Sequence, residues 1–131
     1  QHHIPLNDAL IVEGKWNPES GALGVSTLLS RGEAFTALVA SNDDMAIGAV
    51  KQLHDSGVAT PGQVSVIGFD DVSIAPYIIP SLSSVRIPVT EMIKETISRL
   101  IFMLDGGDLT LQQTFSGELI LRDSVMPGPH V

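Results

Sequence analysis

The sequence predicts an α/β fold with a parallel sheet, and three observations indicate this class. Short apolar runs alternate along the chain with longer segments whose apolar residues recur every three or four positions, a pattern typical of strands joined by helices. The central run, residues 64–69, is rich in valine and isoleucine, as expected of a buried parallel strand. Polar residues follow two of the runs directly, at 41–44 and 70–71. Open α/β sheets hold their ligands at such strand ends.

The first third of the chain is predicted to hold a strand and a helix. Residues 9–13 form an apolar run that Gly14 ends. Asn17 and Pro18 suit the cap and first turn of a helix, and Gly32 suits its end. We therefore expect a strand at 9–13 followed by a helix from about 18 to 31.

The middle third repeats this order. Residues 35–40 are predicted to form a strand, and Asn42 is predicted to cap the next helix, which ends near Gly57. Asp43 and Asp44 fall in the first turn of that helix, where acids balance the helix dipole. The central strand at 64–69 follows.

The last part of the chain is less regular. Pro76 and Pro80 exclude a long helix after the central strand. Residues 82–86 are predicted to be a strand, residues 89–105 the longest helix, and residues 115–122 an antiparallel edge strand.

Composition limits the class of ligand and partner. A chain of 131 residues suits one domain. A net charge of −8 disfavours phosphate, nucleic acid and anionic membrane, so a neutral ligand such as a carbohydrate fits better. The chain has no cysteine and no apolar run near the roughly 20 residues of a membrane span. The four histidines (2, 3, 54 and 130) are scattered, so no metal site and no cofactor are predicted.

Three residues are candidates for ligand contact, each with a plain structural alternative. Asn42 caps a helix, but its amide can also bond a ligand hydroxyl. Asp70 can accept two sugar hydroxyls or simply support a turn. Trp16, the single tryptophan, can pack in the core or stack on a sugar ring. From the residues themselves these alternatives stay open.

Enzyme activity has little support in the sequence. No GxSxG, P-loop or GxGxxG motif is present, so no catalytic residue is predicted. The acid pairs at 43–44 and 70–71 could hold Mg²⁺, but no phosphate-cradling loop accompanies them.

Four segments, in their order and spacing, resemble the LacI/GalR family of bacterial transcription regulators, and galactose-type repressors in particular. They are residues 12–16 (VEGKW), 41–49 (SNDDMAIGA), 61–71 (PGQVSVIGFDD) and 80–88 (PSLSSVRIP). The resemblance implies a fold similar to the type I periplasmic binding proteins, a three-layer sandwich with a parallel sheet, of which residues 1–131 would be mostly the C-terminal subdomain. It implies that a helix-turn-helix domain and the first subdomain precede Gln1.

The resemblance also implies a function. The chain would be the sugar- or glycoside-sensing and dimerising part of a cytoplasmic repressor, with no enzymatic activity. Operator DNA would be bound only through the N-terminal domain. The alternative within the same fold is a periplasmic sugar-binding receptor.

Site residues follow from the same matching. Trp16 falls where the family packs an aromatic ring on the effector, and Asn42 and Asp70 fall where it bonds effector hydroxyls. Ile87 falls in the cleft, where some members have a polar side chain. The homodimer interface would include Ala46, Ile47, Val50, Lys51, Ile74, Tyr77, Ile78 and Ile79. Independently of the resemblance, the apolar residues in the irregular segment 74–79 suggest a partner surface.

Overall fold

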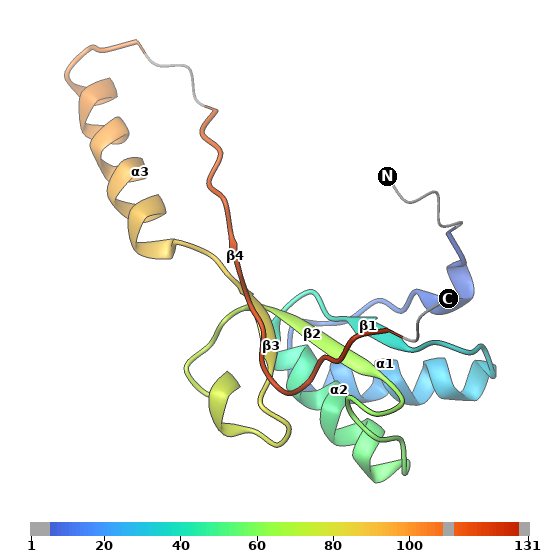
Figure 1. The fold of residues 1–131 in the computed structure, drawn as a ribbon. Coiled ribbons are helices and arrows are strands. Elements are labelled where there is room, and N and C mark those ends of the chain that lie inside the picture. The colour runs from blue at the N-terminus through green and yellow to red at the C-terminus, as the bar shows by residue number, and fades with distance from the viewer. Residues whose placement is uncertain (1–5, 109–111, 129–131) are drawn as a thin grey trace.

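The computed structural model describes residues 6–108 and 112–128, and its centre is a four-stranded sheet in the order β1-β2-β3-β4 (Figure 1). The first three strands are parallel, and β4 pairs antiparallel with β3. Their bounds are Ala37–Val39, Ser65–Asp70, Ser83–Arg86 and Glu118–Ile120. The predicted α/β class, the central strand, and the antiparallel edge strand are confirmed.

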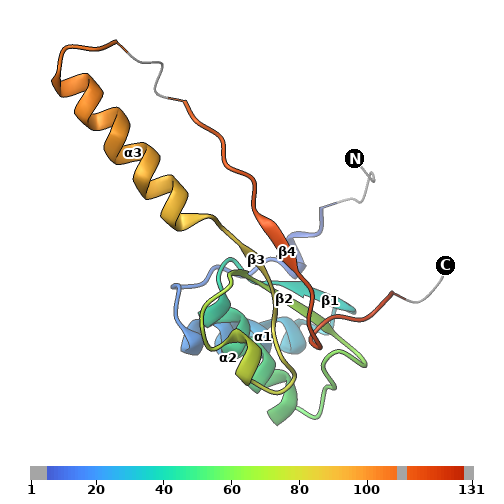
Figure 2. The same cartoon turned by 60° about the vertical axis from the view of Figure 1, so that its left-hand side comes forward.

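Two helices, α1 (Pro18–Arg31) and α2 (Asp43–Asp55), lie together on one side of the sheet in both views (Figures 1 and 2). Both start at the predicted asparagine caps, since Asn17 and Asn42 each accept a backbone hydrogen bond from the first turn. Gly32 ends α1 with a φ of 72°. Of the three layers expected, the described residues supply the sheet and this one helical layer.

The core lies between these helices and the sheet, and α1 packs backbone to backbone against α2. A Cβ at Gly48 would lie 1.9 Å from the carbonyl oxygen of Pro18, and one at Gly21 would lie 2.0 Å from that of Met45. Only glycine allows so close an approach. The buried residues of the main core cluster are Val25, Ala40, Ala46, Ala49, Val50, Leu53, Val64, Val66, Ala75 and Leu82.

The prediction of a strand at residues 9–13 is wrong. The structure has a short 3₁₀ helix, η1 (Asp8–Leu10), followed by extended residues that pair with no described strand. A cavity of about 260 Å³ lies between residues 10–14, α1 and β1. The apolar run and β1 both line this cavity, and the run forms no ladder with β1, although it has strand-like residues. None of the predicted ligand-binding residues lines this cavity.

The helix α3 (Val89–Leu104) matches its prediction but projects away from the sheet and the other helices (Figures 1 and 2). None of its 16 residues is buried. The irregular segment before β3 contains only a short 3₁₀ helix, η2 (Ala75–Tyr77), in the described chain. No described helix has the length and apolar character that a membrane span needs.

Candidate functional site

The carboxyl ends of β1, β2 and β3 meet at one edge of the sheet and bring the predicted ligand-binding residues to it. Asn42 follows β1 closely, Asp70 ends β2, and Ile87 directly follows β3. Asp70 is paired in register with Arg86, the residue before Ile87. Trp16 joins this edge because its carbonyl oxygen accepts a hydrogen bond from Asn42 Nδ2 at 3.3 Å.

Asn42 fills its capping role completely. Its Oδ1 accepts a hydrogen bond from the backbone N–H of Met45 at 3.0 Å, and the residue is 9% exposed. The predicted cap is therefore confirmed. A ligand could use only the remaining hydrogen-bonding capacity of the amide, so ligand contact stays a prediction.

Trp16 is not a core residue of the described chain. Its side chain is 66% exposed, and its backbone has a φ of 60°, in the left-handed region. That conformation is uncommon for a bulky residue. Of the two alternatives, packing in this core is excluded, and an indole face at the sheet edge remains available to a ligand.

Asp70 is an exposed acid at this edge. Among the described residues, none forms a hydrogen bond or an ion pair with its carboxylate. Partial burial, and then the nearby charges of Asp43 and Asp44, raise its pKa. The backbone of Asp70 has a φ of 108°, a strained value for aspartate. The site therefore presents an acceptor whose hydrogen bonds are not used inside the described chain.

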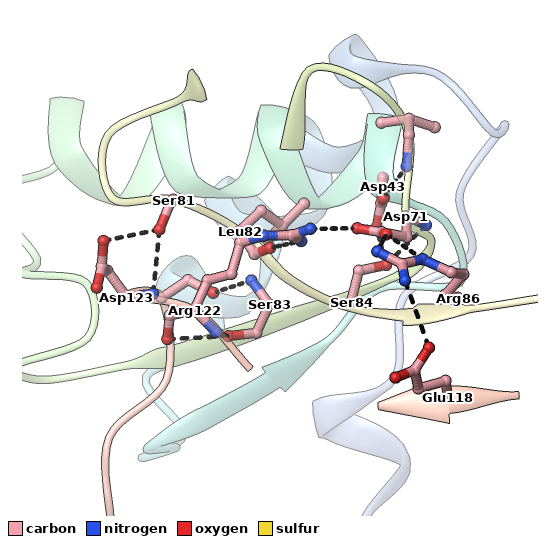
Figure 3. Close-up of polar contacts among 12 residues, drawn as sticks. Asp43, Asp71, Ser81, Leu82, Ser83, Ser84, Arg86, Glu118, Arg122 and Asp123 are labelled. Atoms are coloured by element: carbon pink, nitrogen blue, oxygen red, sulfur yellow. Dashed lines mark hydrogen bonds and ion pairs between the residues drawn. The ribbon is translucent and has the colours of Figure 1, made fainter. Parts of the chain in front are cut away.

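Asp43 has a role that sequence reasoning missed. It is completely buried in the first turn of α2 (Figure 3). Its Oδ1 accepts a hydrogen bond from Ser84 Oγ at 2.6 Å, and its Oδ2 accepts one from the Val72 N–H at 2.8 Å. A Cβ at position 68 would lie 2.1 Å from Asp43 Oδ1, so Gly68 leaves the room for this carboxylate. Gly68 was the sign in the sequence that another group approaches the backbone closely at this point, but the sequence does not show which group.

Asp71 supports the loop through two arginines (Figure 3). Arg86 Nε donates to Asp71 Oδ2 at 2.7 Å, and Arg122 pairs with Asp71 Oδ1 at 2.7 Å. Burial by itself would raise the pKa of Asp71, but hydrogen bonds and charge from Arg122 and Arg86 outweigh it and hold the pKa below its usual range. The loop after Asp70 is thus tied to the ends of β3 and β4.

A metal centre at the acid pairs finds no support in the described residues. No group of three or more histidine, aspartate or glutamate side chains among them is placed to hold a metal ion. Both oxygens of Asp43 already accept hydrogen bonds. His2, His3 and His130 lie outside the described residues.

The residues predicted to form the dimer interface differ in how deeply they are buried. Ala46 and Val50 are buried in the chain's own core, and their place at an interface stays a prediction. Ile47 and Ile78 are partly buried against that core. The remaining predicted residues, Lys51, Ile74, Tyr77 and Ile79, are exposed, and Ile79 is 94% so.

Comparison with known proteins identifies the relatives of this fold. Residues 4–125 match the model of the periplasmic binding protein-like domain. Over 126 residues the chain is 69% identical to the HTH-type transcriptional regulator AscG of Escherichia coli strain K12, covering 96% of this chain and 38% of AscG. The chain therefore spans well under half the length of this relative.

Two solved structures share the fold closely. A complex of the transcriptional regulator CelR with cellobiose has a TM-score of 0.88 and 27% identity, over 92% of this chain and 37% of that one. The Lac repressor dimer bound to operator and the anti-inducer ONPF has a TM-score of 0.83 and 27% identity, over 88% of this chain and 40% of that one. These relatives are transcriptional regulators, which favours a regulator over a transport receptor.

Proposed function

Because the chain belongs to the periplasmic binding protein-like domain family and resembles its LacI/GalR-type regulators, we propose that it is the effector-sensing and dimerising part of a cytoplasmic transcriptional repressor. The observation that carries the proposal is the carboxylate of Asp70, unpartnered in the described chain, at the sheet edge that also holds Asn42 and the exposed indole of Trp16.

The chemistry of this edge suits a sugar or glycoside. An ionised carboxylate can accept hydrogen bonds from two adjacent hydroxyls, and such charge-assisted bonds are the stronger kind. The indole of Trp16 offers a flat apolar face for a pyranose ring. A net charge of −8 also favours a neutral ligand over an anion. CelR, whose structure superposes on this chain, was solved with cellobiose.

In this proposal the effector acts by shifting an equilibrium between two arrangements of the sensing core. A ligand changes such an equilibrium only by binding one arrangement more tightly than the other. DNA would be contacted by parts of the protein outside residues 1–131, as the acidic charge of this chain suggests. The Lac repressor dimer, solved with operator and an anti-inducer, is a related case.

The exposed apolar residues of the segment around η2 support a homodimer. Tyr77 and Ile79 are 79% and 94% exposed, and Ile74 lies beside them in sequence. Contiguous exposed apolar side chains often mark a protein–protein interface. Lys51 of α2 completes the exposed part of the predicted surface.

The test is a titration of the full-length repressor by calorimetry with three probe sugars: cellobiose, D-galactose and methyl β-D-glucopyranoside. We expect Asp70→Ala to weaken binding of whichever probe binds by about 1.5–3 kcal/mol, because a hydrogen bond to a charged group is lost. Asn42→Asp keeps the helix cap but removes the donor, and should weaken binding by about 0.5–1.5 kcal/mol.

Asp44→Ala is the matched control, since Asp44 is exposed and lies in the same helical turn as Asp43. It should leave the affinity within about 0.5 kcal/mol of the wild type. Unchanged binding in both Asp70→Ala and Asn42→Asp would rule out this edge as the effector site.

A further inference from the structure

The backbone at Asp70 and Asp71 has an unusual conformation that the sequence does not explain. Both residues have positive φ values, 108° and 55°. Non-glycine residues adopt such values at a cost in free energy, and they persist only where surrounding contacts hold them. Two left-handed aspartates in succession therefore call for anchors close by.

The structure supplies two backbone anchors immediately after Asp70. The N–H of Asp71 donates to Ser84 Oγ at 3.0 Å, and the N–H of Val72 donates to Asp43 Oδ2 at 2.8 Å. Ser84 Oγ in turn donates to Asp43 Oδ1 at 2.6 Å. Ser84 and Asp43 are both fully buried, so the bond between them is shielded from water, and the two bonds to the loop are partly buried (Figure 3).

We propose that Ser84 and Asp43 are positioning residues that hold the Asp70 carboxylate in its ligand-accepting place. The inference rests on the proposed function, because it takes Asp70 as the effector contact. Asp43 also follows Asn42 in the chain, so one helical turn carries one candidate ligand contact and fixes the other. The spacing of Asn42 and Asp70 is then set by the N-terminus of α2.

Ser83 provides a control for this role within the same strand. It is as buried as Ser84, and its hydroxyl also makes two hydrogen bonds. Those bonds go to the backbone carbonyl oxygen and N–H of Arg122, and neither of them reaches the backbone of residues 70–72. Ser83→Ala and Ser84→Ala therefore remove the same group at the same depth, but only Ser84→Ala removes a direct hydrogen bond to the loop backbone.

The experiment uses the full-length repressor with two measurements: calorimetric titration with cellobiose, D-galactose and methyl β-D-glucopyranoside, and amide hydrogen exchange of peptides covering residues 69–73. Ser84→Ala should weaken binding of the probe sugar about tenfold and speed exchange in these peptides about tenfold. Ser83→Ala should change each by less than about twofold. In an Asp70→Ala background, Ser84→Ala should weaken binding no further, because its effect passes through Asp70.

Equal effects of the two serine variants on binding or on exchange overturn the proposal, as does a Ser84→Ala effect on binding that persists without Asp70. If Asp70→Ala binds every probe like the wild type, the proposed function fails instead. The amide hydrogen exchange of residues 69–73 then tests, without any ligand, whether Ser84 and Asp43 hold the loop. Should Ser84→Ala not fold, Asp43→Asn with Asp44→Asn as its control repeats the comparison. Asp43→Asn should then weaken binding and speed exchange, while Asp44→Asn should do neither.

Discussion

The helices α2 and α3 are similar in pattern and opposite in environment. Both have an apolar stripe, but α2 buries six of its 13 residues, whereas α3 buries none of its 16. Leu53 of α2 is completely buried, while Ile97 and Leu100 of α3 are more than half exposed. An amphipathic pattern thus indicates that a helix has an apolar face, but not what covers that face.

The same contrast predicts that the packed part of the chain and α3 contribute differently to the free energy of unfolding. The site described above lies on the packed part, with α1, α2 and the parallel strands. The stripe of α3 (Met92, Ile93, Ile97, Leu100, Ile101 and Leu104) is uncovered in the described chain. Its residues should contribute little to the stability of these 131 residues.

The largest expected effect on stability tests the contrast between α2 and α3 directly. In the 131-residue chain, Leu53→Ala should lower the free energy of unfolding by about 2–5 kcal/mol, because it leaves a cavity in the core. Ile97→Ala should change it by less than about 0.5 kcal/mol, because that side chain is already half in water. Urea unfolding followed by circular dichroism measures both. A cost of several kcal/mol for Ile97→Ala in this chain would show that α3 is packed after all.

A smaller effect on stability is expected where the packed part of the chain joins the segment that leads to α3. Asp71 pairs with Arg86 at the end of β3, from which the chain leads to α3, and with Arg122 after β4. Asp71→Asn should cost about 1.5–3 kcal/mol at neutral pH, since bonds to a charged group are lost in a buried place.

The pH dependence of this variant follows from the lowered pKa of Asp71. Stability from a depressed aspartate is fully present above its unfolded pKa of about 3.9 and is lost as the pH falls through the folded pKa. The difference between wild type and Asp71→Asn should therefore be constant from pH 7 to about 5 and shrink below about 3.9. Urea unfolding across this range measures it. A difference that grows on acidification would contradict the ion-pair assignment.

The smallest effect is expected on the surface of α3. Glu95 and Arg99 form an ion pair one helical turn apart, at 2.6 Å, and both are partly exposed. Glu95→Gln should cost only about 0.3–0.5 kcal/mol, and added salt should reduce that cost. Thermal unfolding at low and high salt checks this. A loss above about 1 kcal/mol would mean that the pair contributes more than local helix stability.

Much of the fold was predictable because the relevant interactions are local. Asn17 and Asn42 cap their helices through bonds within one turn, and Gly32 ends α1 in the left-handed conformation that favours glycine. The bounds of α3 also followed from its periodicity and from Pro88 before it. These features depend on neighbours three or four residues apart, which the sequence displays.

The features that the sequence did not reveal depend on contacts between distant residues. Residues 9–13 have the composition of a strand, but a strand also needs a partner, and these residues have none in the described chain. Ala46 and Val50, which the resemblance assigns to a dimer surface, are buried in the core of this chain. Neither outcome depends on local sequence.

For the candidate site, the sequence by itself determined two of the side chains at the carboxyl ends of the strands, Asn42 and Asp70, whereas Ile87 was placed there by the family resemblance. It did so because strand ends are marked by a local change from apolar to polar residues. Only the tertiary structure decided how they are held, with Asp43 seated against Gly68 and bound to Ser84, 41 residues away in the chain. A buried hydrogen bond of that span exists only after α2, β2 and β3 have packed together, because packing alone brings its donor and acceptor within reach.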